Sequence, residues 1–210
     1  MRRLLVRKLA FSLTAVVGLL MASSAPAGAA TVSEAQYGFT FSLPSNWTQI
    51  PLNAKDIGAI IGAAAKGDPA LENVLDQQAV AATKKGLKVF AVGPISGGFF
   101  PNLNVGVTSA MGAPTGSAFV SLMMAEVKIT LTEAGATHVD AAPAHLPLGP
   151  AVQAGYQLKL SVTAHPVLVH GLQFYVEHGS RLYVITFSGT TPAEYQPAAH
   201  EVVTSWHWQG

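Results

Sequence analysis

The sequence predicts an α+β fold in which an antiparallel β-sheet is packed with helices. Segments with strand-like alternation lie at the start, in the middle and near the end of the chain, and helical patterns separate them and close the chain. The late strand-like segments 154–162, 167–177 and 181–188 follow one another closely, as in an antiparallel meander. A doubly wound parallel sheet would need a helix between successive strands, so this order favours an antiparallel sheet.

The first 29 residues have the organisation of an export signal. Four basic residues precede an apolar run over residues 9–22, and a segment of small residues follows over residues 25–29. The run is about fourteen residues long, whereas a membrane span needs roughly twenty. We therefore expect a signal peptide over residues 1–29, cleaved after Ala29, and a single domain over residues 30–210. The expected location is secreted or extracytoplasmic.

Composition excludes several classes of chemistry. The chain has no cysteine, which excludes disulfides, thiolate metal sites, a cysteine nucleophile and a lipid anchor on cysteine. Residues 30–210 carry eight basic and eleven acidic residues, a formal net charge of −3. Nucleic-acid binding depends on lysine and arginine neutralising phosphates, so we expect no nucleic-acid partner.

The first half of the mature chain predicts a hairpin, two helices and a strand. Residues 37–43 alternate large apolar and small residues, and a proline-containing turn leads to residues 47–50 as the expected hairpin partner. Residues 57–65 place apolar side chains on one helical face, and a second helix is expected from an Asp-Pro start at residue 68 to Gly86. Residues 87–92 then predict a strand.

An apolar loop separates that strand from the next one, which we expect over residues 103–108. The loop contains Phe99 and Phe100 within residues 97–102. Adjacent exposed aromatic side chains are unfavourable unless something covers them, which indicates a contact surface for a partner or an apolar ligand. The alternative is that both rings pack under the edge of the sheet and complete the core.

A long helix is expected over residues 117–133. Its apolar side chains are spaced to form a broad stripe that should be buried over much of the circumference. The members are Phe119, Val120, Leu122, Met123, Met124, Val127, Ile129 and Leu131. Core packing explains them, and a cavity for a lipid or another apolar molecule between helices and sheet is the alternative.

The remaining elements lie toward the C-terminus. We expect a short strand over residues 136–142, a proline-rich connector over 143–150, and a tight turn over 177–180 within the meander. Thr191 and Glu194 are spaced as a capping box that opens the closing helix. Val202, Val203 and Trp206 should then point to the sheet.

Three motifs together resemble a known family. They are the segment from Tyr37 to Trp47 (YGFTFSLPSNW), the late strand RLYVITFS over residues 181–188, and Ser205-Trp206 after the closing helix. The chain resembles the PsbP-like superfamily and, within it, the LpqN/LpqT type of exported actinobacterial proteins. The resemblance implies an α/β sandwich and a mostly non-enzymatic binding, adaptor or assembly role. Its actinobacterial members are generally envelope lipoproteins or secreted proteins; this chain lacks the lipobox cysteine.

No catalytic motif is present. The chain has no nucleophile elbow, no Ser-x-x-Lys and no phosphate-binding loop, so we expect no catalytic residues and no cofactor. His200 and His207 share a helical face with Glu194, which could hold a divalent metal ion. His138 and Asp140 stand two apart on the expected strand and could pair a base with a carboxylate.

Together these observations predict an exported, non-enzymatic binding or assembly module of the bacterial cell envelope. Phe99 and Phe100 are the predicted binding residues, and the partner is an envelope protein or an apolar ligand. Two alternatives stay open: a carrier of a lipid or another apolar small molecule, and a metal-binding protein or metal-dependent enzyme that uses Glu194, His200 and His207.

Overall fold

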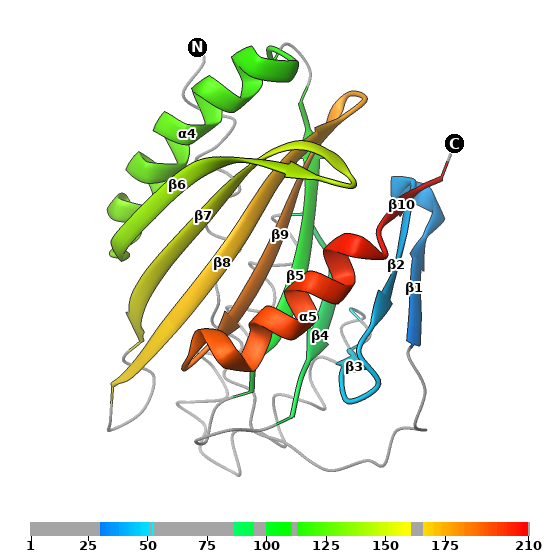
Figure 1. Cartoon of the computed structure of the whole chain (residues 1–210), viewed down its shortest axis with the longest axis vertical. Helices are drawn as coiled ribbons and strands as arrows, with labels where there is room; N and C mark the ends of the chain where they lie inside the picture. The colour runs from blue at the N-terminus through cyan, green and yellow to red at the C-terminus, as the bar shows by residue number, and fades with distance from the viewer. Residues whose placement is uncertain are drawn as a thin grey trace.

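The computed structural model describes residues 30–50, 52, 86–94, 100–110, 113–160 and 166–209. Within these residues, two antiparallel sheets and two α-helices build an α+β fold, which confirms the predicted class (Figure 1). The helices predicted over residues 57–65 and 68–86 lie outside the described part of the chain.

The larger sheet has seven strands, and every pair of neighbours is antiparallel. Their order is β3-β4-β5-β9-β8-β7-β6. The strands are β3 (Thr48–Gln49), β4 (Leu87–Val92), β5 (Asn102–Ser109), β6 (Thr137–Leu146), β7 (Gly149–Leu160), β8 (Val167–His178) and β9 (Arg181–Gly189). The predicted meander is therefore confirmed as β7-β8-β9, with its tight turn between His178 and Arg181.

The smaller sheet corrects one predicted pairing. It has the order β1-β2-β10, with β1 at Ala30–Glu34, β2 at Phe39–Leu43 and β10 at His207–Trp208. Residues 47–50 were the predicted partner of β2, but Thr48 and Gln49 pair with β4 instead. A short 3-10 turn, Ala35–Tyr37, ends at Gly38 with φ of 74°, a conformation that suits glycine and lets β1 fold back on β2. Alternation within β2 predicted a buried face, but it did not say which strand lies alongside.

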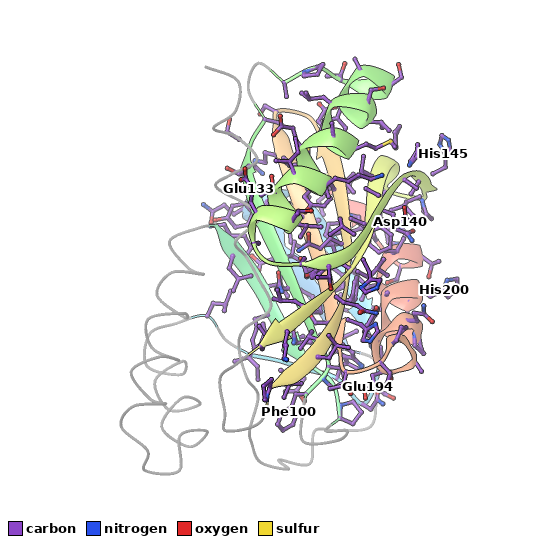
Figure 2. The ribbon with its side chains drawn as sticks, turned by 90° about the vertical axis from the view of Figure 1, so that its left-hand side faces the viewer. Phe100, Glu133, Asp140, His145, Glu194 and His200 are labelled. Carbon is purple, nitrogen blue, oxygen red and sulfur yellow. The ribbon has the colours of Figure 1, made fainter. Side chains whose placement is uncertain are left out.

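The two helices pack on opposite faces of the large sheet. Helix α4 (Gly116–Glu133) packs on β6 and β7, and helix α5 (Pro192–Thr204) packs on β9 and β2. Figure 2 shows α4, which carries Glu133, and α5, which carries His200, on opposite sides of the strands. Each helix covers its own buried apolar cluster, so the sheet is the middle layer of the fold.

Helix α4 starts one residue before its predicted boundary, but its buried stripe is narrower than predicted. Met123 and Leu131 are buried in the cluster between α4 and the sheet, as core packing predicted. Leu122 and Ile129 are 42% and 53% exposed. The reason is geometric, because a helix on a sheet buries only the side that faces the strands, whatever the hydropathy of the other side.

The segment predicted as a proline-rich connector is part of a long hairpin. Pro143 lies inside β6, opposite Val152 on β7, and β6 continues to Leu146. Because β6 is an edge strand, the missing N–H of Pro143 is tolerated there. The predicted strand over 136–142 is therefore correct in type and too short.

The Glu194 carboxylate closes the start of α5 through Thr190, the residue before the N-cap, whereas the predicted capping box has it accept from the backbone N–H of the N-cap residue itself. The Glu194 carboxylate accepts hydrogen bonds from the Thr190 backbone N–H and hydroxyl, both at 2.7 Å. Thr191 is the N-cap residue, but its side chain makes no capping bond. Val202, Val203 and Trp206 are buried as predicted.

Candidate functional site

A backbone hydrogen bond joins the two ends of the predicted binding loop. The Gly93 N–H donates to the Pro101 carbonyl at 2.7 Å, which joins the two ends of the loop. Phe100 is half-buried, while Pro101 and Asn102 directly after it are buried. Phe99 lies outside the described residues. In Figure 2, Phe100 lies at the lower end of the sheet.

A patch of buried polar side chains begins beside Phe100, and the sequence analysis did not identify it. Its members stand opposite one another on neighbouring strands, so they share one face of the sheet. The residues that alternate with them, Leu103, Ile185 and Phe187, belong to the cluster under α5, so the patch lies on the other face, the one that carries α4. We call it the neutral patch; it consists of Asn102, Asn104, Gln173, Thr186 and Ser188, each at most 4% exposed.

Gln173 is held at both ends by tyrosines. Its Nε2 donates to the Tyr156 hydroxyl at 3.4 Å, and the Tyr175 hydroxyl donates to its Oε1. Burial raises the pKa of Tyr175, with a further contribution from nearby Tyr156, so Tyr175 stays protonated and keeps donating. These contacts fix the orientation of the Gln173 amide.

A glycine makes room for this arrangement. Tyr156 and Gly171 are direct cross-strand partners, and a Cβ on Gly171 would come within 2.1 Å of Tyr156 Cζ. The Tyr156 ring therefore lies over the β8 backbone, where its hydroxyl reaches Gln173. Gly171 is a positioning element of the neutral patch.

The other end of the patch is tied to the predicted loop. Ser188 Oγ donates to Asn102 Oδ1 at 3.4 Å, and Asn102 Nδ2 donates to the Phe100 carbonyl at 3.4 Å. The half-buried aromatic residue and the neutral patch are thus neighbours in one region of the molecule.

Two polar atoms at the centre of the patch have no hydrogen-bond partner in the described part of the chain. Asn104 Oδ1 and Thr186 Oγ1 are buried, and no described residue forms a hydrogen bond with either. Asn104 and Thr186 stand directly opposite each other on β5 and β9, and Thr186 is also opposite Gln173 on β8. Buried polar groups are rarely left unpaired, so this pair marks the patch as unusual.

The predicted metal set is not brought together. Glu194 accepts hydrogen bonds from Thr190, whereas His207 lies on β10 beside Thr40. Among the described residues, no group of three or more His, Asp or Glu side chains could hold a metal ion. The reason is that α5 ends at Thr204, so the helical face that would align His200 with His207 does not continue to His207.

The predicted pair of His138 and Asp140 is interrupted by a bulge. The register of β6 against β7 shifts between Thr137 and Asp140, and His138 has φ of 52°. The His138 ring nitrogen Nδ1 lies 3.3 Å from Thr137 Oγ1. A period of two puts residues on the same face only in a regular strand, so the spacing argument for this pair does not apply across the bulge.

The neutral patch left only an ambiguous signal in the sequence. Polar residues alternate with apolar ones at Asn102 and Asn104 on β5, and at Thr186 and Ser188 on β9. Such alternation normally predicts a solvent-facing side of a strand. Only the exposed fractions of these side chains in the folded chain, each at most 4%, show that this side is buried.

Comparisons with known proteins give two similar solved structures over most of the chain. The chain is similar to cyanobacterial PsbP (CyanoP) from Synechocystis sp. PCC 6803, with 12% identity, a TM-score of 0.49, and coverage of 90% of this chain and 97% of that one. It is also similar to LpqN of Mycobacterium tuberculosis, described as involved in cell envelope biogenesis. There the identity is 9%, the TM-score 0.48, and the coverage 90% of this chain and 88% of that one. These two structures are of the PsbP and LpqN types that the sequence motifs resemble.

Sequence-level comparisons add no relative, since no family model and no curated protein matches the chain. Within the described residues, no helix is long and apolar enough to cross a membrane.

Proposed function

We propose that the chain is an exported, non-enzymatic binding module of the bacterial cell envelope, and that Phe99 and Phe100 belong to its binding surface. The observation that carries this proposal is that Phe100 is half-buried at the end of a loop whose two ends are joined. The Gly93 N–H donates to the carbonyl of Pro101, the residue after Phe100, and Asn102 next to it is buried. The Phe100 carbonyl accepts a hydrogen bond from Asn102 Nδ2, which fixes the backbone beside the ring, and an aromatic side chain offers a large contact area at a small entropic cost.

Export is proposed from the signal predicted over residues 1–29. Ala30 pairs with Leu43 on β2, so the proposed mature chain would start within the small sheet. N-terminal sequencing of the protein recovered from the cell envelope or the culture fluid tests this. Ala30 is the expected first residue, and a chain that keeps its first 29 residues would contradict cleavage.

Photo-crosslinking in living cells tests the binding surface. A photoreactive phenylalanine analogue replaces Phe100 in one strain and exposed Gln153 on β7 in a control strain. We expect a discrete adduct from position 100 that is absent from position 153 and is weakened by Phe99→Ala in the same chain. Mass spectrometry of the adduct then identifies an envelope protein or a small molecule. Equal adducts from both positions, or none from position 100 in exported protein, would show that the surface is wrongly assigned.

A further inference from the structure

Helix α4 has a second uncharged side, which faces away from the sheet. The first packs on the sheet through Met123, Val127 and Leu131. At 3.6 residues per turn, positions on the opposite side of the helix recur at alternating steps of four and three residues. They are Ala118, Leu122, Ala125, Ile129 and Thr132, all of them exposed. A helix between a sheet and water normally carries charged and polar residues on its outer side, so this side needs an explanation.

The spacing of these residues predicts a helix as the partner. Steps of four and three average 3.5 residues, the repeat with which two helices pack along a continuous line of contact. Leu122 and Ile129, 42% and 53% exposed, supply the large side chains, and Ala118 and Ala125 leave room between them. A single exposed leucine is ordinary, whereas a regular line of uncharged residues is not. We call this line of five residues, from Ala118 to Thr132, the α4 seam.

Charged residues beside the α4 seam fit a second copy of the same helix. Glu126 and Glu133 lie on one side of the seam, and Ser121 and Lys128 lie on the other. In a parallel pair of helices, these two sides of neighbouring copies lie next to each other. Lys128 of each copy then lies beside Glu133 of the other copy, one turn further along the helix. An antiparallel pair would instead bring the two acidic sides together, which is unfavourable.

The size of the α4 seam indicates a weak, reversible contact. Helix α4 has 18 residues and is about 27 Å long, and five of its residues form the seam. A stable protein interface typically involves about 20–30 residues on each partner. Two copies should therefore separate on dilution and pair at high local concentration.

We propose that the α4 seam is a self-association surface through which two copies of the chain pair with their α4 helices parallel. The pair has two-fold symmetry, so the same residues of both copies meet along the seam. This surface is separate from the loop at Phe100, which lies at the lower end of the sheet, away from α4, in Figure 2. The inference therefore does not depend on the binding role proposed for the loop.

Analytical ultracentrifugation of the full exported chain tests self-association. Its weight-average mass, followed from about 1 μM to about 1 mM, should rise from that of one chain toward that of two. Leu122→Glu with Ile129→Glu introduces two carboxylates into each seam and should weaken association at least about tenfold. The matched control is Leu168→Glu, because Leu168 is 47% exposed on β8, outside the seam, and this variant should associate like the parent. In dilute solution all three proteins should have closely similar Tm values, because the substituted side chains are exposed in the single chain.

A single introduced cysteine tests the parallel arrangement without any charged variant. The chain has no cysteine, so Ala118→Cys provides one thiol, which meets its symmetry mate across a parallel pair. Under mild oxidation with copper phenanthroline, we expect a disulfide-linked dimer, whereas Leu168→Cys, the control, should stay monomeric. An antiparallel pair would place Ala118 opposite Thr132 and the two Ala118 positions about 21 Å apart, too far for a disulfide.

The other outcomes overturn the proposal in distinguishable ways. A chain that stays a monomer up to about 1 mM shows that the seam does not bind a second copy. A dimer that persists in the Leu122→Glu, Ile129→Glu variant uses another surface. If a mixture of Ala118→Cys and Thr132→Cys chains becomes linked while Ala118→Cys alone does not, the pair is antiparallel and the charge argument is wrong.

Discussion

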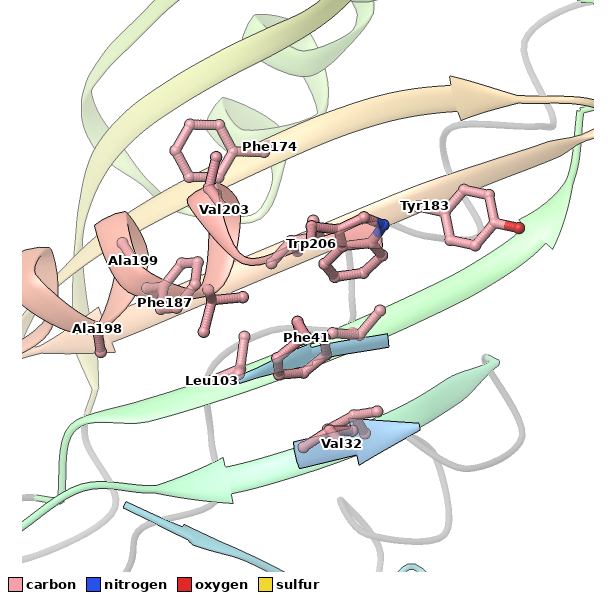
Figure 3. Close-up of a cluster of buried hydrophobic side chains, with 14 of the residues drawn as sticks. Val32, Phe41, Leu103, Phe174, Tyr183, Phe187, Ala198, Ala199, Val203 and Trp206 are labelled. Carbon is pink, nitrogen blue, oxygen red and sulfur yellow. The ribbon is translucent and has the colours of Figure 1, made fainter. Parts of the chain in front are cut away.

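The two faces of the seven-stranded sheet differ in the kinds of side chain that they bury. Under α5, the face is apolar and rich in stacked aromatic rings: Trp206 stacks on Phe39 and Phe41, with ring centroids 4.6 and 5.2 Å apart. Figure 3 shows Trp206 and Phe41 within this buried cluster. On the other face, α4 covers an apolar cluster over β6 and β7, while the neutral patch occupies β5, β9 and β8.

The two faces also differ in how completely their buried polar atoms are paired. The aromatic face joins the small sheet, α5 and the large sheet into one cluster, and its only unpartnered buried side-chain atom among the described residues is Trp206 Nε1, which stands among rings. On the neutral patch, Asn104 Oδ1 and Thr186 Oγ1 stand opposite each other without a hydrogen-bond partner among the described residues. The aromatic face is therefore where we expect the larger contribution to stability.

Removing the central aromatic side chain should have the largest effect. Trp206→Ala should lower the free energy of unfolding by about 3–5 kcal/mol, because a buried tryptophan leaves a cavity and loses its stacking partners. Urea denaturation followed by circular dichroism measures this. The control is His207→Ala at the exposed neighbouring position, expected within about 0.5 kcal/mol of the parent. A loss below about 1 kcal/mol for Trp206→Ala would contradict the role of this face.

A single methyl group should disturb the other face. Gly171→Ala places a Cβ within 2.1 Å of Tyr156 Cζ, so the ring and its bond to Gln173 must shift. The expected cost is about 1–3 kcal/mol in denaturation experiments. Gly155→Ala on the neighbouring strand is the matched control, since its Cβ would meet nothing within 4 Å, and it should leave stability unchanged or raise it by about 0.4–1 kcal/mol. Equal losses in both variants would contradict the described position of Tyr156.

Alkaline pH should weaken the protein through Tyr175. Its folded-state pKa is raised by burial, whereas a tyrosine in the unfolded chain titrates near pH 10, so the folded state holds its proton more tightly. The stability contribution is complete below about pH 10 and decreases as pH rises, by about 1.4 kcal/mol per pH unit for this one group. Denaturation between pH 9 and 11 should show a shallower decline in Tyr175→Phe than in the parent. Burial also raises the pKa of Tyr195, so part of the decline should remain.

The outer side of α4 should tolerate change. Ile129→Lys should alter the free energy of unfolding by less than about 0.5 kcal/mol, because the side chain is 53% exposed. Met123→Ala on the buried side of the same helix is the contrast, with an expected loss of about 2–5 kcal/mol. A large loss for Ile129→Lys would mean that this side is covered in the functional protein.

Local sequence patterns correctly predicted the elements whose formation depends on residues close together in the chain. Helix α4 and the β8–β9 turn have the expected positions, because helical spacing and a Gly-containing turn act over a few residues. The pairing of β2 with β1 was missed, since several segments could serve as its neighbour. Pro143 was interpreted as part of a connector, because its place on an edge strand is a property of the sheet.

For the candidate site as well, the sequence singled out some residues and not others. Phe99 and Phe100 could be chosen from the sequence, because adjacent aromatic residues in a loop stand out locally, and they stay a proposal. Asn104, Thr186 and Gln173 come from three strands up to 82 positions apart in the chain, and each on its own is typical of an exposed strand face.

The sequence by itself determined the fold class, the meander, the long helix and the closing helix, because periodicity and end signals are short-range properties. The tertiary structure decided which strands are neighbours, which side of α4 faces the sheet, and that the polar residues of β5, β9 and β8 are buried together. Burial is a property of the assembled layers, so an asparagine that would be ordinary at a surface becomes a buried hydrogen-bond acceptor only when the folded chain covers that face of the sheet.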